Sequence, residues 1–121
     1  MEIKKLNNST VEGRKERPVR VLQFGEGNFL RAFVDWQLDI ANEKGVIDTS
    51  VALISPLFKE SRVLNILNEQ DCLYNVVLEG IEDGKPKCEN RLITSGSDAF
   101  NPASDYERYL GYILSPELRF I

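Results

Sequence analysis

The chain has 121 residues, of which 42% are hydrophobic and 28% charged, and its formal net charge is −4. This size allows one domain with its own core and is short for an enzyme of two domains. An acidic balance argues against nucleic acid as a partner, because binding to phosphates needs a concentrated basic face. No apolar run reaches the ~18–20 residues of a membrane span, and no secretory signal opens the sequence, so we expect a cytoplasmic protein with no membrane partner.

The cysteine and histidine content limits the available chemistry. The chain has two cysteines, Cys72 and Cys88, and no histidine. Without histidine or a Cys-x-x-Cys pair, the sequence predicts no metal site. The spacing of the cysteines does not exclude a disulfide, although isolated thiols of cytosolic proteins are more often reduced.

A strand, a glycine turn and a helix are predicted near the N-terminus. Residues 1–17 are polar and lack periodicity, so we expect a mobile leader. Pro18 precedes a strand over 19–24 that is apolar on both faces, as a central strand covered by helices is. Gly25 and Gly27 follow, and a helical pattern begins directly after them. This order places free backbone N–H groups of a helix end beside a buried strand, which favours an anion such as phosphate.

The two glycines have separate expected roles. Gly25 would allow the sharp turn, and Gly27 would let the backbone approach a pyrophosphate with no Cβ in the way. The dinucleotide fingerprint Gly-x-Gly-x-x-Gly is incomplete, because Leu30 stands at its third position. The local pattern alone is also compatible with a tight strand–helix turn that binds nothing.

The first helix is predicted over residues 28–44, with Asn28 as its N-cap. Arg31 has two interpretations: it reaches a phosphate or a partner domain, or it pairs with Asp35 one turn on. The residues expected on the apolar face are Phe29, Ala32, Phe33, Trp36 and Ile40, and those on the opposite side are Arg31, Asp35, Asp39 and Glu43.

A second strand over residues 51–55 completes a parallel strand–helix–strand unit. In dinucleotide-binding folds an acidic residue often closes this strand and holds the adenosine ribose. Here Ser55 and Pro56 take that place, so the choice between NAD and NADP is poorly marked. Lys59 and Arg62 either favour a 2′-phosphate or belong to a solvated charged face.

The middle of the chain predicts a short helix and a hairpin. Residues 61–68 have helical spacing, with three apolar side chains facing inward. Two extended stretches, 73–81 and 86–95, flank Asp83-Gly84, which is a strong hairpin-turn signal. We interpret the hairpin as an insertion or edge feature and assign it no chemistry.

The last part of the chain is expected to contain a loop, a helix and the start of a strand. Residues 96–103 have the composition of a loop, and Ser104 and Glu107 have the spacing of a capping box. Residues 119–121 are expected to begin a further buried strand. On that ground we expect the sequence to be part of a longer protein.

The segment 23–37, QFGEGNFLRAFVDWQ, resembles the nucleotide-binding motif of the polyol-specific long-chain dehydrogenases, the mannitol dehydrogenase family. That motif has no third glycine, which accounts for Leu30. The continuation 33–37 is most similar to the tagaturonate reductase (altronate oxidoreductase) branch, and the resemblance extends over nearly the whole chain after about residue 18. The matched motif positions are Gly25, Gly27, Phe29, Arg31 and Ala32.

The resemblance implies an α/β fold with a Rossmann-like parallel sheet into which the antiparallel hairpin is inserted. Residues 18–121 would be the N-terminal part of this dinucleotide-binding domain, with a C-terminal substrate domain outside the sequence. It also implies an NAD-dependent oxidoreductase that interconverts D-tagaturonate and D-altronate in hexuronate catabolism. Fructuronate reductase and mannitol dehydrogenase are alternatives of the same family. A stand-alone nucleotide-binding module without catalysis is the alternative of another class.

The family's catalytic lysine, with asparagine and histidine partners, lies in the C-terminal half, so no catalytic residue is assigned and this chain alone is expected to be inactive. The resemblance places the pyrophosphate on the amides around residues 25–29, with Arg31 as a second contact, and the adenosine near the end of the second strand. The cofactor-binding residues expected are Phe24, Gly25, Glu26, Gly27, Asn28, Phe29, Leu30, Arg31, Ser55 and Pro56.

Overall fold

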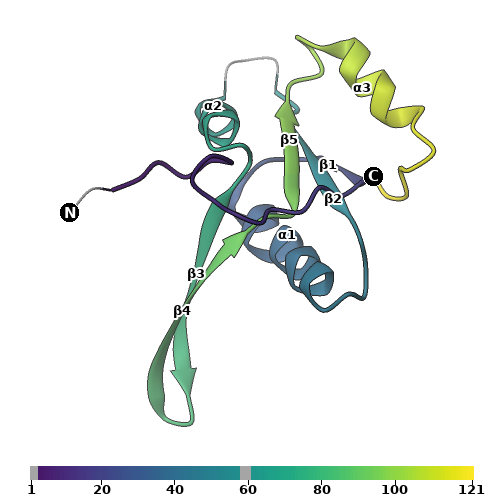
Figure 1. Ribbon diagram of the computed structural model, residues 1–121. Helices are drawn as coiled ribbons and strands as arrows, with labels where there is room; N and C mark the ends of the chain where they lie inside the picture. The colour runs from purple at the N-terminus through teal and green to yellow at the C-terminus, as the bar shows by residue number, and fades with distance from the viewer. Residues whose placement is uncertain (1–2, 58–60) are drawn as a thin grey trace.

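A computed structural model describes residues 3–57 and 61–121 (Figure 1). Its centre is a parallel sheet with the strand order β1-β2-β5, and the helix α1 connects the first two strands. This confirms the predicted Rossmann-like sheet, and the strand after the leader has the predicted bounds. The elements of this unit are β1 (Val19–Phe24), α1 (Asn28–Glu43), β2 (Ser50–Ile54) and β5 (Gly96–Phe100).

The strand β5 corrects the loop predicted over residues 96–103. It pairs in parallel with β2, and Ala99 and Phe100 are buried. Glycine, serine and aspartate are poor strand formers, so the local pattern indicated a loop while the pairing with β2 decides the structure. A Cβ on Gly96 would lie 3.3 Å from both the carbonyl oxygen of Cys72 and Cδ1 of Leu53. The missing side chain therefore lets β5 approach its neighbours closely.

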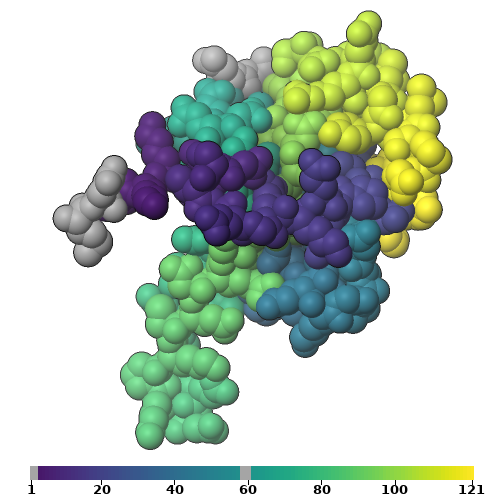
Figure 2. Space-filling model, in the orientation of Figure 1, coloured from purple at the N-terminus to yellow at the C-terminus, as the bar shows by residue number. Residues whose placement is uncertain are grey.

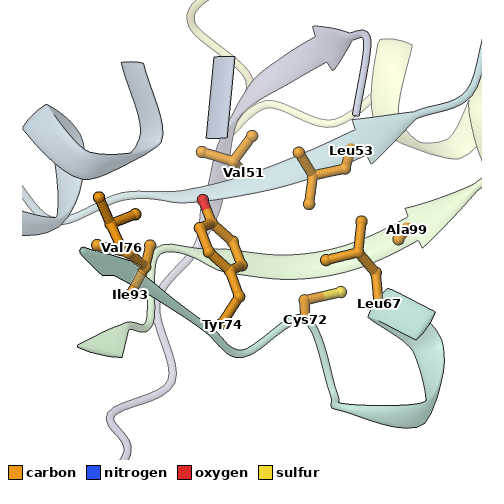
Figure 3. Packing of buried hydrophobic residues seen from close by; sticks show 8 residues of the cluster. All are labelled: Val51, Leu53, Leu67, Cys72, Tyr74, Val76, Ile93 and Ala99. Atoms are coloured by element: carbon orange, nitrogen blue, oxygen red, sulfur yellow. The ribbon is translucent and has the colours of Figure 1, made fainter. Parts of the chain in front are cut away.

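Helices cover both faces of the sheet. Successive side chains of β2 point to opposite faces, so each face of this strand packs against different helices. Val51 and Leu53 pack toward α1, α2 (Arg62–Glu69) and the base of the hairpin (Figure 3). Ala52 and Ile54 pack toward α3 (Tyr106–Ile113). The larger cluster consists of Val51, Leu53, Leu67, Cys72, Tyr74, Val76, Ile93 and Ala99.

The orientation of α1 confirms the predicted apolar face only at Trp36, which packs against the core, and contradicts it at the two phenylalanines. Phe29 is 72% exposed and Phe33 50%, whereas Asp35, Asp39 and Asn42 are buried. Buried polar groups are tolerated where they are hydrogen-bonded, and all three have partners outside α1. Periodicity within the helix could not reveal those partners. They are Gln23 and Tyr74 for Asp35, Arg91 and Thr94 for Asp39, and Thr49 for Asn42.

The predicted hairpin forms a separate two-stranded sheet of β3 (Tyr74–Glu82) and β4 (Lys85–Ile93). It turns at Asp83 and Gly84, where φ is 52° and 75°, and extends away from the rest of the molecule (Figures 1 and 2). Only its base is buried, so the tip adds no core. Cys88 on β4 is exposed, Cys72 is buried, and both are free thiols.

The N-terminal arm, residues 3–17, lies at the amino end of the parallel sheet (Figure 1). Arg14 donates to the carbonyl oxygens of Asp71, at 2.6 Å, and of Gly96. Arg17 forms an ion pair with Asp48 at 2.6 Å. The arm is thus tied to the sheet by two arginines, while its mobility stays a prediction.

The C-terminal residues add to the sheet beside β1. Phe120 forms a parallel bridge with Val21, on the edge of β1 opposite to β2. The sequence predicted that this segment is buried. That prediction is wrong, since Phe120 is 67% exposed. The N-cap of α3 is Asp105 rather than Ser104, because its side chain accepts from the Arg108 amide.

Candidate functional site

The carboxyl end of β1 lies where the order of the sheet changes direction. The chain goes from β1 to β2 on one side, and Phe120 bridges β1 on the other. In open α/β sheets the crevice at such a point is the usual place for a ligand. The amide of Gly25 donates to the carbonyl of Ile54 at 2.8 Å, which fastens the turn after β1 to the end of β2.

Gly25 is required by the fold. Its φ is +129°, a conformation that residues with a Cβ rarely adopt, and an added Cβ would lie 2.9 Å from Cδ1 of Leu30. Leu30 therefore packs over the turn at the position where a third glycine was missing. Leu30, which replaces the third glycine of the fingerprint, thus packs against Gly25.

Gly27 differs from Gly25 in both respects. Its φ is −73°, which any residue can adopt, and an added Cβ would meet nothing within 4 Å. No contact in the described chain therefore needs glycine at this position. The missing side chain leaves open the space in front of the N-terminus of α1.

The N-terminus of α1 has no side-chain cap. The N-cap residue is Gly27, so the prediction of Asn28 as N-cap is wrong. The first intrahelical bond of this end joins the Arg31 amide to the Gly27 carbonyl at 3.2 Å. The amides of Asn28, Phe29 and Leu30 precede that bond and point out of the helix end, with the positive end of its dipole.

Arg31 lies beside the turn and does not form the predicted pair with Asp35. Its Nε donates to the carbonyl of Glu26 at 2.8 Å, and its Nη2 donates to Oδ1 of Asn28 at 2.6 Å. The guanidinium also lies over the ring of Tyr74, 5.3 Å from the centroid. A cation is thus held next to the unsatisfied amides.

A buried polar network supports the turn from below. The side-chain amide of Gln23 donates to the carbonyl of Gly25 at 3.0 Å and to Oδ2 of Asp35 at 3.2 Å. The Tyr74 hydroxyl donates to the carbonyl of Arg31 at 2.9 Å and lies 3.4 Å from Asp35. Burial raises the pKa of Asp35 to about 6, against the opposing effect of these hydrogen bonds. The network connects the turn with α1 and with the base of the hairpin, to which the sequence assigned no role.

The end of β2 presents a buried hydroxyl. Ser55 is fully buried, and within residues 3–57 and 61–121 its Oγ has no hydrogen-bond partner. Pro56 next to it is exposed. A contact of either residue with adenosine stays a prediction. Lys59 lies outside the described residues, and Arg62 is exposed at the start of α2.

Glu26, between the two glycines, connects the turn to α2. Its Oε1 accepts a hydrogen bond from Oγ of Ser61 at 3.0 Å. Ser61 is the N-cap of α2 and accepts from the Leu64 amide at 3.2 Å. No spacing rule could indicate this contact, because the two residues are 35 positions apart.

In residues 3–57 and 61–121, no group of three or more histidine, cysteine, aspartate or glutamate side chains is arranged to hold a metal ion. None of the helices described has the length and apolar character needed to cross a membrane.

Comparisons with known proteins agree with this geometry. The family model described as the mannitol dehydrogenase Rossmann domain matches residues 19–119. The altronate oxidoreductase of Bacillus subtilis is 42% identical over 119 residues, and that of Phocaeicola vulgatus 41%. These matches cover 98% of this chain but 24% of each relative. The chain thus spans about a quarter of the length of these relatives.

Two solved structures share the fold. Mannitol 2-dehydrogenase of Pseudomonas fluorescens, in a ternary complex with NAD and D-mannitol, matches with a TM-score of 0.81 and 21% identity. The match covers 95% of this chain and 25% of that one. A substrate-free D-sorbitol dehydrogenase matches with a TM-score of 0.68 and 19% identity, over 96% of this chain and 26% of that one.

Proposed function

Since this chain belongs to the mannitol dehydrogenase family, we propose that its glycine turn binds the pyrophosphate of NAD in an oxidoreductase acting on a keto sugar acid. The observation that carries the proposal is Gly27. The fold needs no glycine there, yet its absent side chain opens the space before the uncapped end of α1. A ligand with a compact negative group explains both features.

The residues of the turn fit the pyrophosphate chemically. The amides of Asn28, Phe29 and Leu30 are donors with no intrahelical acceptor, and the helix dipole adds a partial positive charge. Arg31, held by Glu26 and Asn28, would add a full positive charge beside them. Phe24, which is half exposed at the end of β1, would give the dinucleotide an apolar surface.

The role of this chain in the reaction is binding and orientation. The bound nicotinamide would supply the hydride, and the protein would fix the position of the cofactor and tune its surroundings. We assign no catalytic residue in this chain. The proton donor is proposed to lie in a further substrate domain, of which residues 18–121 would be the N-terminal, dinucleotide-binding neighbour.

The proposed reaction is the reduction of D-tagaturonate to D-altronate in hexuronate catabolism. It is supported by the names of the relatives at 41–42% identity, which are altronate oxidoreductases. NAD as cofactor is supported by the ternary complex of the mannitol dehydrogenase with the same fold.

A substrate screen of the full-length protein tests this proposal. We expect oxidation of NADH to be fastest with tagaturonate, compared with fructuronate and fructose, and faster than oxidation of NADPH. Fastest turnover with fructuronate or fructose would assign the reaction of another branch of the family. Binding of NADH without turnover of any sugar would favour a nucleotide-binding module, and failure to bind either dinucleotide would contradict the proposal.

A further inference from the structure

Residues 54–57, at the end of β2, include no carboxylate of the kind by which many dinucleotide-binding domains hold the adenosine ribose. In such domains an acidic residue at this strand end hydrogen-bonds the ribose 2′-hydroxyl, and its charge disfavours a 2′-phosphate. Here β2 ends in Ile54 and is followed by Ser55, Pro56 and Leu57. Glu26, from another segment, lies near this strand end, where its carboxylate accepts a hydrogen bond from Ser61.

The carboxylate of Glu26 reaches this place from the preceding turn. The turn is fastened to the end of β2 by the hydrogen bond from the Gly25 amide to Ile54. From there the Glu26 side chain extends to Ser61, the first residue of the segment that leads into α2. The carboxylate thus bridges the carboxyl end of β1 and the start of the helix that follows β2.

A hydrogen bond from Ser61 orients the carboxylate of Glu26. The Ser61 hydroxyl donates its single proton to Oε1 and uses a lone pair to accept from the Leu64 amide. Arg31 donates to the backbone carbonyl of Glu26 and to Asn28, so its charge is directed to the turn. Glu26 is half-buried, and among the described residues its Oε2 accepts no hydrogen bond.

We propose that Glu26 selects NAD over NADP, because its carboxylate accepts a hydrogen bond from the adenosine ribose and repels a 2′-phosphate. This inference rests on the proposed function, since it places a dinucleotide on the glycine turn. It goes beyond that proposal by assigning cofactor choice to the side chain between the glycines. The usual carboxylate at the end of β2 is thereby replaced from a neighbouring segment.

The test measures binding of ADP-ribose and 2′-phospho-ADP-ribose to the full-length protein by calorimetry. These probes lack the nicotinamide, so they report on the adenosine end alone. We expect the wild type to prefer ADP-ribose by about tenfold or more, since juxtaposed like charges are strongly unfavourable. In Glu26→Gln this preference should fall at least severalfold, chiefly because 2′-phospho-ADP-ribose binds more tightly.

Glu69→Gln is the matched control, because Glu69 is exposed at the far end of α2; it should keep the wild-type preference. An unchanged preference in Glu26→Gln would overturn the inference. So would a wild type that prefers 2′-phospho-ADP-ribose and loses that preference in Arg62→Ala. If neither probe nor NADH binds to the wild type, the proposed function itself fails, which is a distinct outcome.

Discussion

The two ends of the parallel sheet differ in how their polar groups are satisfied. At the amino end, polar groups are hydrogen-bonded within the chain. Asn42 exchanges two hydrogen bonds with the backbone of Thr49, and Arg14 donates to two carbonyl oxygens. At the carboxyl end the helix amides after Gly27 have no cap, and the Ser55 hydroxyl has no partner among the residues described. Both ends are built from the same three strands.

We infer that this difference separates groups that maintain the fold from groups that contact the proposed dinucleotide. Buried or helix-end polar groups are normally hydrogen-bonded, so we infer that the unpaired groups at the carboxyl end are contacts for another molecule. The buried Nε1 of Trp36 and Oδ1 of Asp35, on α1, also have no partner among the described residues, so an unpaired atom by itself does not identify a site. Changes at the amino end should therefore alter stability alone. Changes at the carboxyl end should alter binding, with or without stability.

The largest effect is expected from Gly25→Val, which acts on both properties. The φ of +129° and the contact with Leu30 at 2.9 Å should together cost about 4 kcal/mol of unfolding free energy. Urea unfolding measures this loss, and NADH titration should show binding abolished. A variant that is as stable as the wild type would show that the turn does not have the described geometry.

Asp35 makes the unfolding free energy depend on pH, and this effect is somewhat smaller than that of Gly25→Val. Its pKa is raised from 3.8 to about 6 in the fold, so between these values the folded state binds more protons than the unfolded state. The contribution of Asp35 to the unfolding free energy is fully present below about pH 4. It is lost as the pH rises to about 6, a change of about 3 kcal/mol. Urea unfolding at pH 4 to 7 measures it.

The asparagine variant isolates this contribution. Asp35→Asn does not titrate, so its unfolding free energy should lack the fall between about pH 4 and 6 that the wild type shows. Asp83→Asn, at the exposed hairpin turn, should keep the wild-type profile. Identical profiles for the wild type and Asp35→Asn would contradict the assignment.

Asn42→Ala probes the amino end and sharpens the comparison. It leaves the buried N–H and C=O of Thr49 without partners, which should cost about 2 kcal/mol of unfolding free energy. NADH affinity of the folded variant should equal that of the wild type. A loss of affinity comparable to that of a carboxyl-end variant would remove the distinction between the two ends.

Local signals in the sequence were sufficient for several elements. The strand over 19–24, the hairpin turn at Asp83-Gly84 and the helix α2 depend on neighbouring residues, and all three are present as predicted. The glycine turn also follows from local order, because a strand, a glycine pair and a helix are adjacent in the chain.

Contacts between distant residues could not be predicted in this way. The strand β5 exists because it pairs with β2, although its own residues favour a loop. The burial of Asp39 depends on Thr94, 55 positions away, so the helical periodicity could not indicate that this side of α1 is buried. Within the site, the same limit applies to Gln23, Tyr74 and the contact of Glu26 with Ser61.

The most direct test of pyrophosphate binding at the glycine turn compares two glycines whose positions could hold a side chain. Gly27 and Gly80 both have open space at the Cβ position and backbone angles outside the region of positive φ. In the full-length protein, Gly27→Val should keep the unfolding midpoint and lower NADH affinity by about tenfold or more, because the side chain fills the space before the α1 amides.

Calorimetric titration of NADH measures this affinity, with Gly80→Val on the hairpin as the control that should bind like the wild type. We expect a loss of NADH affinity for Gly27→Val alone. Equal NADH affinities for Gly27→Val, Gly80→Val and the wild type would show that the pyrophosphate does not bind at the glycine turn.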